Sequence, residues 1–377
     1  MKYWRGYLFA GLFSALGWAL TEFAKSHTTL MDMVYPYMSR MIVSSMAEWS
    51  SGVSFCVWQV LLLVLIVAVL ASAVLMIVLK WNPIQWFGWV VAAASLVYVL
   101  NLGVFGLNSY AGNLASDIRL EVTEYTVSEL EAAAVHYRDK VKENEKSLRR
   151  DGQGAPVFED FSTLAQQASD GFRYLTYEEG LSVFAGSTIP VKELGLSDWY
   201  AGKTGITFGL TGESAVNPDI PAAALPFAMC REMARRMSIG NDRDADFAAI
   251  LTCAANSSVQ FRYSGYLNAY RLCIAALEAD PTTTGAAALT RVRSGESTGM
   301  TRDLEELMAL YADREDTYQD AEEVQLHDLL VSWYIQEYVL PTQIVEEEIF
   351  DPMDETQVDL TTTTQDVTPE EETEEDE

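Results

Sequence analysis

PFAMCREMARRMSIGNDRDADF, at residues 226–247, describes two helices joined by a short loop. Pro221, just before this stretch, suits the first turn of a helix, and we expect that helix to run to about Met237 and end at Gly240. Asn241 is a favourable cap for the second helix, whose acidic first turn interacts well with the helix dipole.

Arg231, Glu232 and Arg235 stand in the first of these helices with the spacing of the zinc-peptidase motif HExxH. In that motif two His at i and i+4 project from one face and bind zinc, and the Glu after the first His is the general base. Glu232 keeps the base position, but both ligand positions hold arginine. A guanidinium has no lone pair to donate and does not lose its proton in proteins. We therefore expect no metal on this motif, with Glu232 a vestigial base.

Several segments around the motif follow a pattern of order and spacing over about 60 residues. On these segments the chain resembles the domain-of-unknown-function family 3810, bacterial three-pass membrane proteins with an outward zinc-peptidase-like domain carrying HEMAH. The segments are TGE at 211–213, AVN at 215–217, PF at 226–227, REMAR at 231–235, RDADF at 243–247 and FRYSGYLNA at 261–269.

The resemblance implies a mostly helical, zincin-like fold and, for the family, a zinc cofactor and peptide hydrolysis. It also implies that Asp244 stands at the family's third ligand position, where the family has a longer acidic residue, and that Asp246 replaces an Asn. Both His of the family motif are arginine here. The departures predict a relative whose zinc ligands are lost.

Charge is distributed unevenly along the 377 residues, whose formal net charge is −29. Fifteen acidic residues and no basic one lie between Glu346 and the C-terminus. We interpret 345–377 as an acidic, disordered tail. The chain lacks the basic stripe that would neutralise phosphates, which argues against a nucleic-acid partner.

Three apolar runs, at about 4–24, 55–79 and 84–107, are long enough to cross a bilayer. Lys2, Arg5 and Lys80 mark the N-terminus and the turn after the second run as cytoplasmic by the positive-inside rule. This predicts a membrane domain at 1–107, with the lipid bilayer as a partner, and an extracytoplasmic domain at 108–344. The fold class is a mainly α membrane protein on the bacterial cell membrane, its host inferred from the resemblance.

Outside the spans, hydrophobic spacing and turn residues give the remaining elements. We expect a mixed loop at 21–51, helices at 117–149, 158–177, 261–279, 301–316 and 322–338, a loose segment at 281–299, and a small β-hairpin within 180–217. In zinc peptidases a strand of this kind often borders the cleft and pairs with extended substrate, and by analogy the hairpin would border a cleft here.

The two arginines of the motif have three alternative interpretations. The favoured one is that both guanidiniums fill the space of a metal and its ligands and pair with Asp244, Asp246 or Glu232, which ties the two helices together. In the second, they belong to a solvated helix face. In the third, Glu232, Asp242, Asp244 and Asp246, with His136 or His327, form a metal site of other ligands, which two nearby arginines would disfavour.

Tyr263, Tyr266 and Asn268 lie on the predicted helix at 261–279 and are candidate cleft residues, because a tyrosine near such a cleft can stabilise an oxyanion. Core packing with a polar tip is the alternative for the tyrosines. Cys253 and Cys273 could form a disulfide or remain buried thiols, since sequence does not give their geometry.

Two function classes follow. The favoured one is an extracytoplasmic pseudopeptidase that binds a peptide, a cell-wall fragment or a protein partner, or serves as a scaffold. The alternative is a hydrolase that uses Glu232 as general base with non-standard metal ligands. Without a metal, water has a pKa near 15.7, and a lone carboxylate contributes about 10² to 10⁴-fold, too little for peptide hydrolysis. These magnitudes favour the first class.

Overall fold

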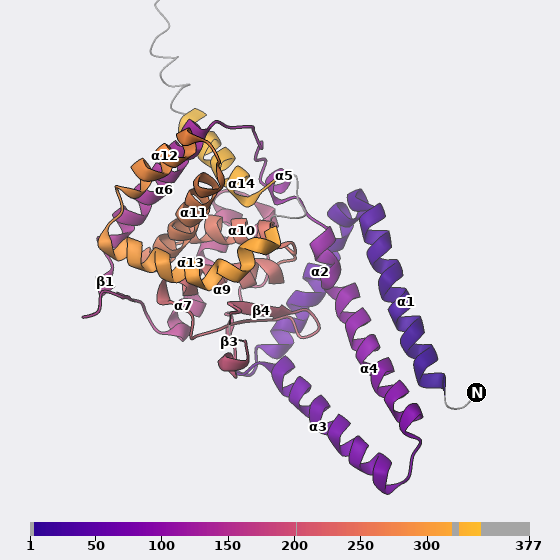
Figure 1. The fold of residues 1–377 in the computed structure, drawn as a ribbon. Coiled ribbons are helices and arrows are strands. Elements are labelled where there is room, and N and C mark those ends of the chain that lie inside the picture. Colours follow the sequence, from indigo (N-terminus) through magenta and orange to yellow (C-terminus); the bar gives the residue numbers. More distant parts are fainter. Residues whose placement is uncertain (1–3, 201, 319–323, 341–377) are drawn as a thin grey trace, which may run out of the picture.

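The computed structural model describes residues 4–200, 202–318 and 324–340. The described chain forms a group of long apolar helices beside a mostly helical domain (Figure 1). The predicted acidic tail at 345–377 lies outside the described residues.

Three helices are long and apolar enough to cross a membrane: α1 (Arg5–Ser26), α3 (Val57–Val78) and α4 (Pro83–Val104). They correspond to the three predicted spans. α1 packs tightly against α4 where two glycines meet, since a Cβ on Gly6 would lie 2.4 Å from the carbonyl carbon of Gly88. α3 has almost no protein around it, which is the surface a lipid-facing helix presents.

The segment predicted as a mixed loop at 21–51 is instead largely the helix α2 (Thr28–Ser50), so that prediction is wrong. Met31, Val43 and Ala47 are buried at helical spacing, and Pro36 lies inside the helix. Tyr35 and Ser39 donate hydrogen bonds to backbone carbonyls at the end of α4, at 3.1 Å to Gly103 and 2.8 Å to Val104. α2 therefore packs across the ends of the apolar helices.

The continuous helix predicted at 117–149 is also wrong. A short η2 (Gly106–Tyr110) and α5 (Leu114–Asp117) follow α4, and the helix α6 (Val127–Glu145) begins only after an extended segment. Its start is fixed by a capping box, in which Thr126 and Glu129 exchange side-chain and backbone hydrogen bonds. The extended segment is held by side chains elsewhere, since the N–H of Thr123 donates to Ser332 at 3.2 Å.

The domain is built around the long helix α11 (Val259–Ala279) (Figure 1). α11 contacts α6, α9 (Leu225–Arg236), α10 (Asp242–Ala254), α12 (Thr283–Arg293), α13 (Thr298–Tyr318) and α14 (Leu326–Tyr334). The prediction of a loose segment at 281–299 is wrong, since this segment contains the helix α12. Thr282 caps α12 by accepting from the N–H of Gly285 at 3.1 Å. The remaining helices are α7 (Phe161–Gln167) and α8 (Ser169–Tyr177). Short helical turns are η3 (Ser182–Phe184), η4 (Ser197–Tyr200), η5 (Ala222–Ala224) and η6 (Ile335–Val339).

Two small sheets accompany the helices. β1 (Arg149–Arg150) pairs antiparallel with β2 (Pro156–Val157). In the second sheet the strand order is β3–β5–β4: β3 (Lys192–Glu193) runs parallel to β5 (Glu213–Val216), and β4 (Gly205–Phe208) runs antiparallel to it. β4 is thus an edge strand within the segment where a hairpin was predicted.

Glu213, at the start of β5, ties the domain to α3. Its buried carboxylate accepts from the N–H groups of Val57 and Trp58, at 2.8 and 2.9 Å, and from the ammonium of Lys192 at 2.6 Å. The first N–H groups of a helix have no partner within it, so this carboxylate caps α3 and neutralises a buried lysine. The TGE segment therefore has a structural role at the junction.

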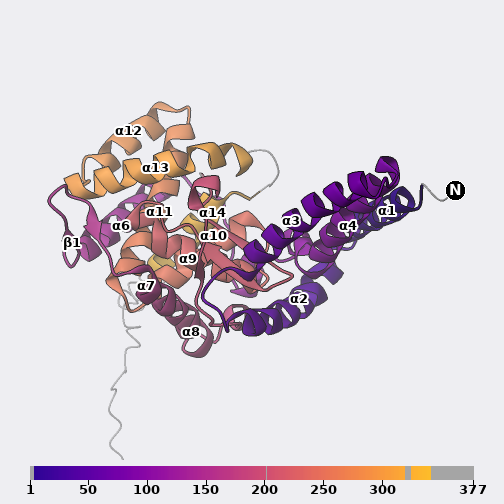
Figure 2. The ribbon, with the colours of Figure 1, turned by 90° about the horizontal axis from the view of Figure 1, so that it is seen from below.

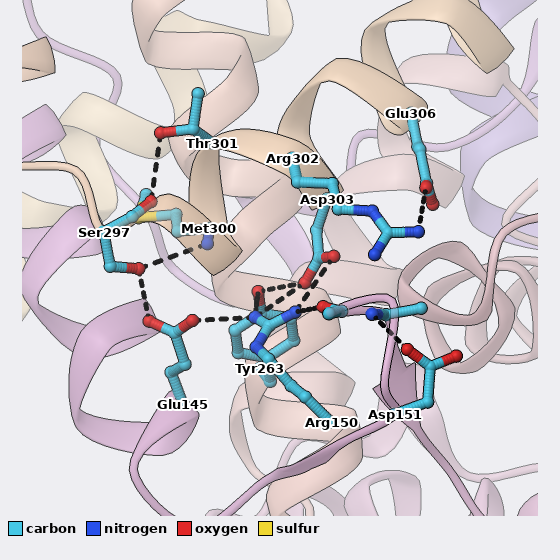
Figure 3. Close-up of polar contacts among 12 residues, drawn as sticks. Glu145, Arg150, Asp151, Tyr263, Ser297, Met300, Thr301, Arg302, Asp303 and Glu306 are labelled. Carbon is cyan, nitrogen blue, oxygen red and sulfur yellow. Dashed lines mark hydrogen bonds and ion pairs between the residues drawn. The ribbon is translucent and has the colours of Figure 1, made fainter.

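A charge network, buried at Tyr263 and Asp303 and partly exposed at Arg150 and Glu145, holds β1 against α6, α11 and α13 (Figure 3). Arg150 donates to Asp303 at 2.9 Å, to Glu145 at 2.7 Å and to the hydroxyl of Tyr263 at 3.1 Å. Tyr263 in turn donates to Asp303 at 2.5 Å. Burial and the adjacent Asp303 raise the pKa of Tyr263, so its phenol remains a donor. Charged hydrogen bonds of this kind fix the packing of four elements.

Candidate functional site

A cleft of about 450 Å³ lies between the edge strand β4 and the helices α9 and α10. One wall is residues 202–207, which lead into and form β4, and the other carries Arg231, Glu232, Arg235 and Asp242. The REMAR motif therefore lies on the wall of a cleft. Its position results from α9 packing against β4 and β5, with α10 packed on its other side.

Arg231 lies at the centre of this wall and is 5 % exposed. Its guanidinium donates to Glu232 at 2.8 Å, to Asp242 at 2.5 Å and to Asp246 through Nε. One arginine therefore links its own helix to two positions of α10. A guanidinium has five N–H donors in a fixed plane, which lets one side chain satisfy three carboxylates.

Arg235, one turn later, occupies the outer part of the cleft. It donates to Asp242 at 2.5 Å and keeps a quarter of its side chain exposed. Asp242 is itself half exposed and is shared between the two arginines. The buried inner cluster thus continues into a partly exposed ion pair of Arg235 and Asp242 on the wall of the cleft.

Glu232 is held by hydrogen bonds to both carboxylate oxygens. Oε1 accepts from Arg231, and Oε2 accepts from the hydroxyl of Thr207 on β4 at 2.7 Å. The backbone carbonyl of Glu232 accepts from Ser214 at 2.8 Å. Gly205 permits this close contact, because a Cβ there would lie 2.6 Å from Cγ of Glu232. The base-position carboxylate serves here as a link between helix and sheet.

Asp244, predicted to pair with the motif arginines, points elsewhere. Its carboxylate accepts from Arg243 at 2.9 Å and from the backbone N–H of Leu114 at 3.0 Å. Its own N–H donates to Asn241 at 2.6 Å, which is the predicted cap of α10. Asp244 therefore anchors the segment that follows the apolar helices, and its two near neighbours in α10, Asp242 and Asp246, pair with Arg231 instead.

Tyr263, Tyr266 and Asn268, the other candidate cleft residues, do not line this cleft. All three lie on α11 and are buried. Tyr263 joins the charge network at Asp303, and Asn268 donates to the backbone carbonyl of Ser264 at 3.0 Å. The structure brings Arg231, Arg235, Glu232 and Asp246 together and places these three in the core.

Zinc does not fit the residues of the cleft. Arg231 fills the space between Glu232, Asp242 and Asp246, and its fixed positive charge would repel a cation there. Among the residues that the structure describes, no three His, Cys, Asp or Glu side chains gather as a metal site would require. His136 packs against Tyr334 and Tyr338, and His327 against Tyr125, so neither histidine reaches the cleft.

The four cysteines are free and buried. Burial raises the pKa of the Cys253 thiol, which also interacts with Cys230, and burial raises the pKa of Cys273. Of the two alternatives for Cys253 and Cys273, the structure contains the buried thiols. Such thiols stay protonated and unreactive.

The sequence profile of the family described as protein of unknown function (DUF3810) matches residues 31–330. The chain belongs to this family. The predicted resemblance is thereby confirmed, and the match covers α2, α3, α4 and most of the domain, including REMAR. No curated protein and no solved structure matches the chain.

In this DUF3810 member, sequence reasoning missed two residues that hold Glu232, as well as a buried arginine next to the motif. Thr207 and Ser214 come from adjacent strands and donate hydrogen bonds to Glu232. The alternation of polar and apolar residues in the predicted hairpin was the sequence signal for these two side chains. Arg236, next to the motif, is 1 % exposed and donates to backbone carbonyls at Ser187 and Ile189. Burial lowers the pKa of Arg236 to about 10. Its position next to Arg235, which is partly exposed, gave no indication that Arg236 is buried.

Proposed function

We propose that this protein is a membrane-anchored pseudopeptidase, whose zincin-like, extracytoplasmic domain binds an extended peptide segment along β4 without hydrolysing it. The three apolar helices are its anchor, and the basic residues at 2, 5 and 80 support a cytoplasmic N-terminus. A domain after an odd number of spans then lies outside.

The observation that carries the proposal is the bonding of Arg231 to Glu232, Asp242 and Asp246 together. These bonds consume the acceptor groups that a metal or a catalytic water would need. Glu232 accepts from Arg231 and from Thr207, so abstraction of a proton from water would require two hydrogen bonds to be given up. The cleft is therefore organised for holding a ligand.

β4 supplies the means of holding a peptide. The N–H of Asn217 on the β5 side donates to the carbonyl of Thr204, which fixes the alternation of the antiparallel ladder. Gly205 and Thr207 then direct their backbone N–H and C=O groups to the open edge, and both line the cleft. An extended peptide can pair with such an edge through main-chain hydrogen bonds.

The test uses the full-length protein in lipid nanodiscs and a library of short random peptides. Peptides that bind are resynthesised with one N-methyl group at each position in turn. Pairing with β4 predicts that alternate positions are sensitive, each losing roughly 1 kcal/mol, about fivefold in Kd. Equal sensitivity at all positions, or at none, would contradict strand pairing.

Two controls make the test specific to the cleft. Lys203→Glu, in the cleft, should change the affinity of charged peptides, whereas Lys146→Glu, on the exposed surface at the end of α6, should not. Mass spectrometry of the bound peptides should find them intact after long incubation. Cleavage that depends on Glu232 would overturn the non-catalytic assignment.

A further inference from the structure

Helix α2 is tied at both ends to apolar helices on one side of the structure. Only His27 separates it from α1, and residues 51–56 separate it from α3. α2 has 23 residues and is therefore about 35 Å long. With α1 and α3 as membrane spans, the end of the first and the start of the second lie at the same membrane face. Connections of one residue and six residues keep both ends of α2 near that face, which favours an orientation along it.

The two sides of α2 differ in what covers them. Ser39, Val43 and Ala47 on one side are buried against the domain and the end of α4. The other side is an apolar stripe at helical spacing with large exposed areas, in which Met33, Tyr37 and Met41 are each about two-thirds exposed. The stripe consists of Leu30, Met33, Val34, Tyr37, Met38 and Met41.

Arg40 borders this stripe, since its guanidinium lies 5.9 Å from the centre of the Tyr37 ring, and both line a cavity with Met33 and Asp32. The polar groups of Arg40 and Asp32 bind the domain. Asp32 accepts from the backbone N–H of Gly112 at 2.8 Å. Arg40 donates to the carbonyls of Met237 at 2.8 Å and Ala185 at 3.0 Å. Glu48 stands beside Trp49 near the C-terminal end of the helix. An apolar face of this kind, with charges satisfied on the domain side, is the pattern of a helix that lies in a membrane interface.

We propose that α2 lies flat in the membrane interface, with the apolar stripe in lipid, and thereby holds the cleft at the membrane surface. Lipid is the occupant because the stripe is continuous in the chain with α1 and α3, whose own surfaces are exposed apolar side chains. The stripe carries no Lys or Arg, so the contact is with acyl chains and is independent of anionic headgroups. This inference rests on the membrane anchorage of the proposed function and is independent of peptide binding.

From its domain side, α2 contacts α9, which carries one wall of the cleft, and the β4–β5 pair, which carries the other. The turn between β4 and β5 reaches it at Gly212, where φ is +65° and a Cβ would lie 2.2 Å from the carbonyl oxygen of Val43. Arg40 binds the carbonyl of Met237, the residue that ends α9. Figures 1 and 2 show α2 beside the domain, next to the apolar helices. The position of α2 in the membrane therefore fixes the position of β4 and α9.

Site-directed fluorescence on the full-length protein in phosphatidylcholine vesicles tests this placement. Met38→Cys and Met41→Cys, which lie outside the cavity beside Arg40, carry an environment-sensitive label on the stripe. Val67→Cys on α3 is the lipid control, and Gln166→Cys on α7 is the aqueous control, since both side chains are exposed. The unsubstituted protein, whose cysteines are buried, gives the background labelling. Quenchers are nitroxide lipids, with the nitroxide near the headgroup or deep in the chains, and aqueous iodide.

We expect the shallow nitroxide to quench both stripe labels strongly, the deep nitroxide to quench Val67, and iodide alone to quench Gln166. Replacing part of the lipid with phosphatidylglycerol should leave the stripe signals unchanged. Stripe labels that respond only to iodide, while Val67 responds to lipid, would overturn this inference and leave the anchorage intact. Stripe labels shielded from every quencher until the protein is diluted in lipid would show a second copy as the occupant, which also overturns it. Failure of Val67 to respond to lipid would refute the anchorage itself.

Discussion

Replacing Arg231 with alanine removes the cation around which the cleft is organised. The substitution leaves Glu232 and Asp246 without their shared donor, and these side chains are 1 % and 4 % exposed. Asp242 is half exposed and can be solvated by water. Two buried carboxylates therefore lose their compensating charge, which is the situation in which breaking a buried ion pair is most costly.

The expected loss follows from those two groups. Removing one partner of a buried ion pair costs about 3–5 kcal/mol, because the remaining charge stays buried. For a domain of this size, 1 kcal/mol corresponds to about 2–4 °C in Tm, so Arg231→Ala should lower the melting temperature by roughly 6–20 °C. Arg235→Ala removes one partly exposed pair with Asp242 and should cost about 0–1 kcal/mol.

The assay is thermal unfolding of the full-length protein in detergent, followed by tryptophan fluorescence, with Arg235→Ala as the matched control. A second variant series separates charge from volume. Arg231→Met should be strongly destabilised, and adding Glu232→Gln and Asp246→Asn should restore most of the stability, because no buried charge is then unpaired. EDTA should leave the wild-type melting temperature unchanged, and elemental analysis should find no zinc bound to the purified chain.

Two results would refute this reasoning. Equal melting temperatures for Arg231→Ala and Arg235→Ala would mean that the inner cluster does not hold α9 to α10. A wild-type melting temperature that falls in EDTA, with zinc found near one per chain, would mean that a metal supplies the charge and that the ligands are not the residues named here.

Three further outcomes test the domain around the cleft. Asp303→Ala removes a fully buried acceptor that Arg150 and Tyr263 share and should cost about 2–3 kcal/mol in urea unfolding, whereas Arg302→Ala, in a partly exposed pair, should cost less than about 1 kcal/mol; equal losses would contradict a stabilising role of the Figure 3 network. Burial and a nearby lysine lower the pKa of His136 from 6.5 to about 4. Between these pH values the unfolded chain binds more protons than the folded chain, so the free energy of unfolding falls as pH falls. His136→Phe should flatten this pH dependence of the urea midpoint, and an unchanged pH dependence would contradict the assignment. Gly212→Ala should lower Tm more than Gly180→Ala, because both glycines have positive φ but only the first meets another backbone within 3 Å; similar losses would show that the contact with α2 is weak.

Hydropathy located α1, α3 and α4, since each is uniformly apolar, but it missed α2. Asp32, Arg40 and Pro36 interrupt the apolar pattern there, and a helix that is buried on one side and apolar on the other has little contrast between its faces. Helical spacing of the small and apolar residues would have identified it. The break before α6 was readable in the Thr126–Glu129 capping box, whereas the extended path of the preceding segment depends on distant side chains that sequence does not place.

The sequence predicted the partners of Arg231 in part, and it did not predict the roles of Asp242 and Asp244. The pairing of Arg231 with Glu232 and Asp246 follows from helical spacing and a short loop between α9 and α10. The sequence suggests Asp242 only as a metal ligand and Asp244 as a pairing partner, because adjacent acidic residues in one helical turn cannot be ranked without knowing what packs beside each. The N–H of Leu114, from a segment 130 residues earlier, decides the orientation of Asp244.

A guanidinium and a zinc ion organise a cleft by different means. Zinc requires deprotonated ligands and must be acquired, so a zinc site depends on pH and on metal supply. Arg231 is part of the chain and stays charged, so its bonds to Glu232, Asp242 and Asp246 form when the chain folds. Because a buried ion cluster is seldom more stable than apolar packing, stability alone does not account for this arrangement. What the cluster provides is a fixed wall opposite the open edge of β4, with Thr207 joining the two, and that is the geometry that the peptide binding we propose requires.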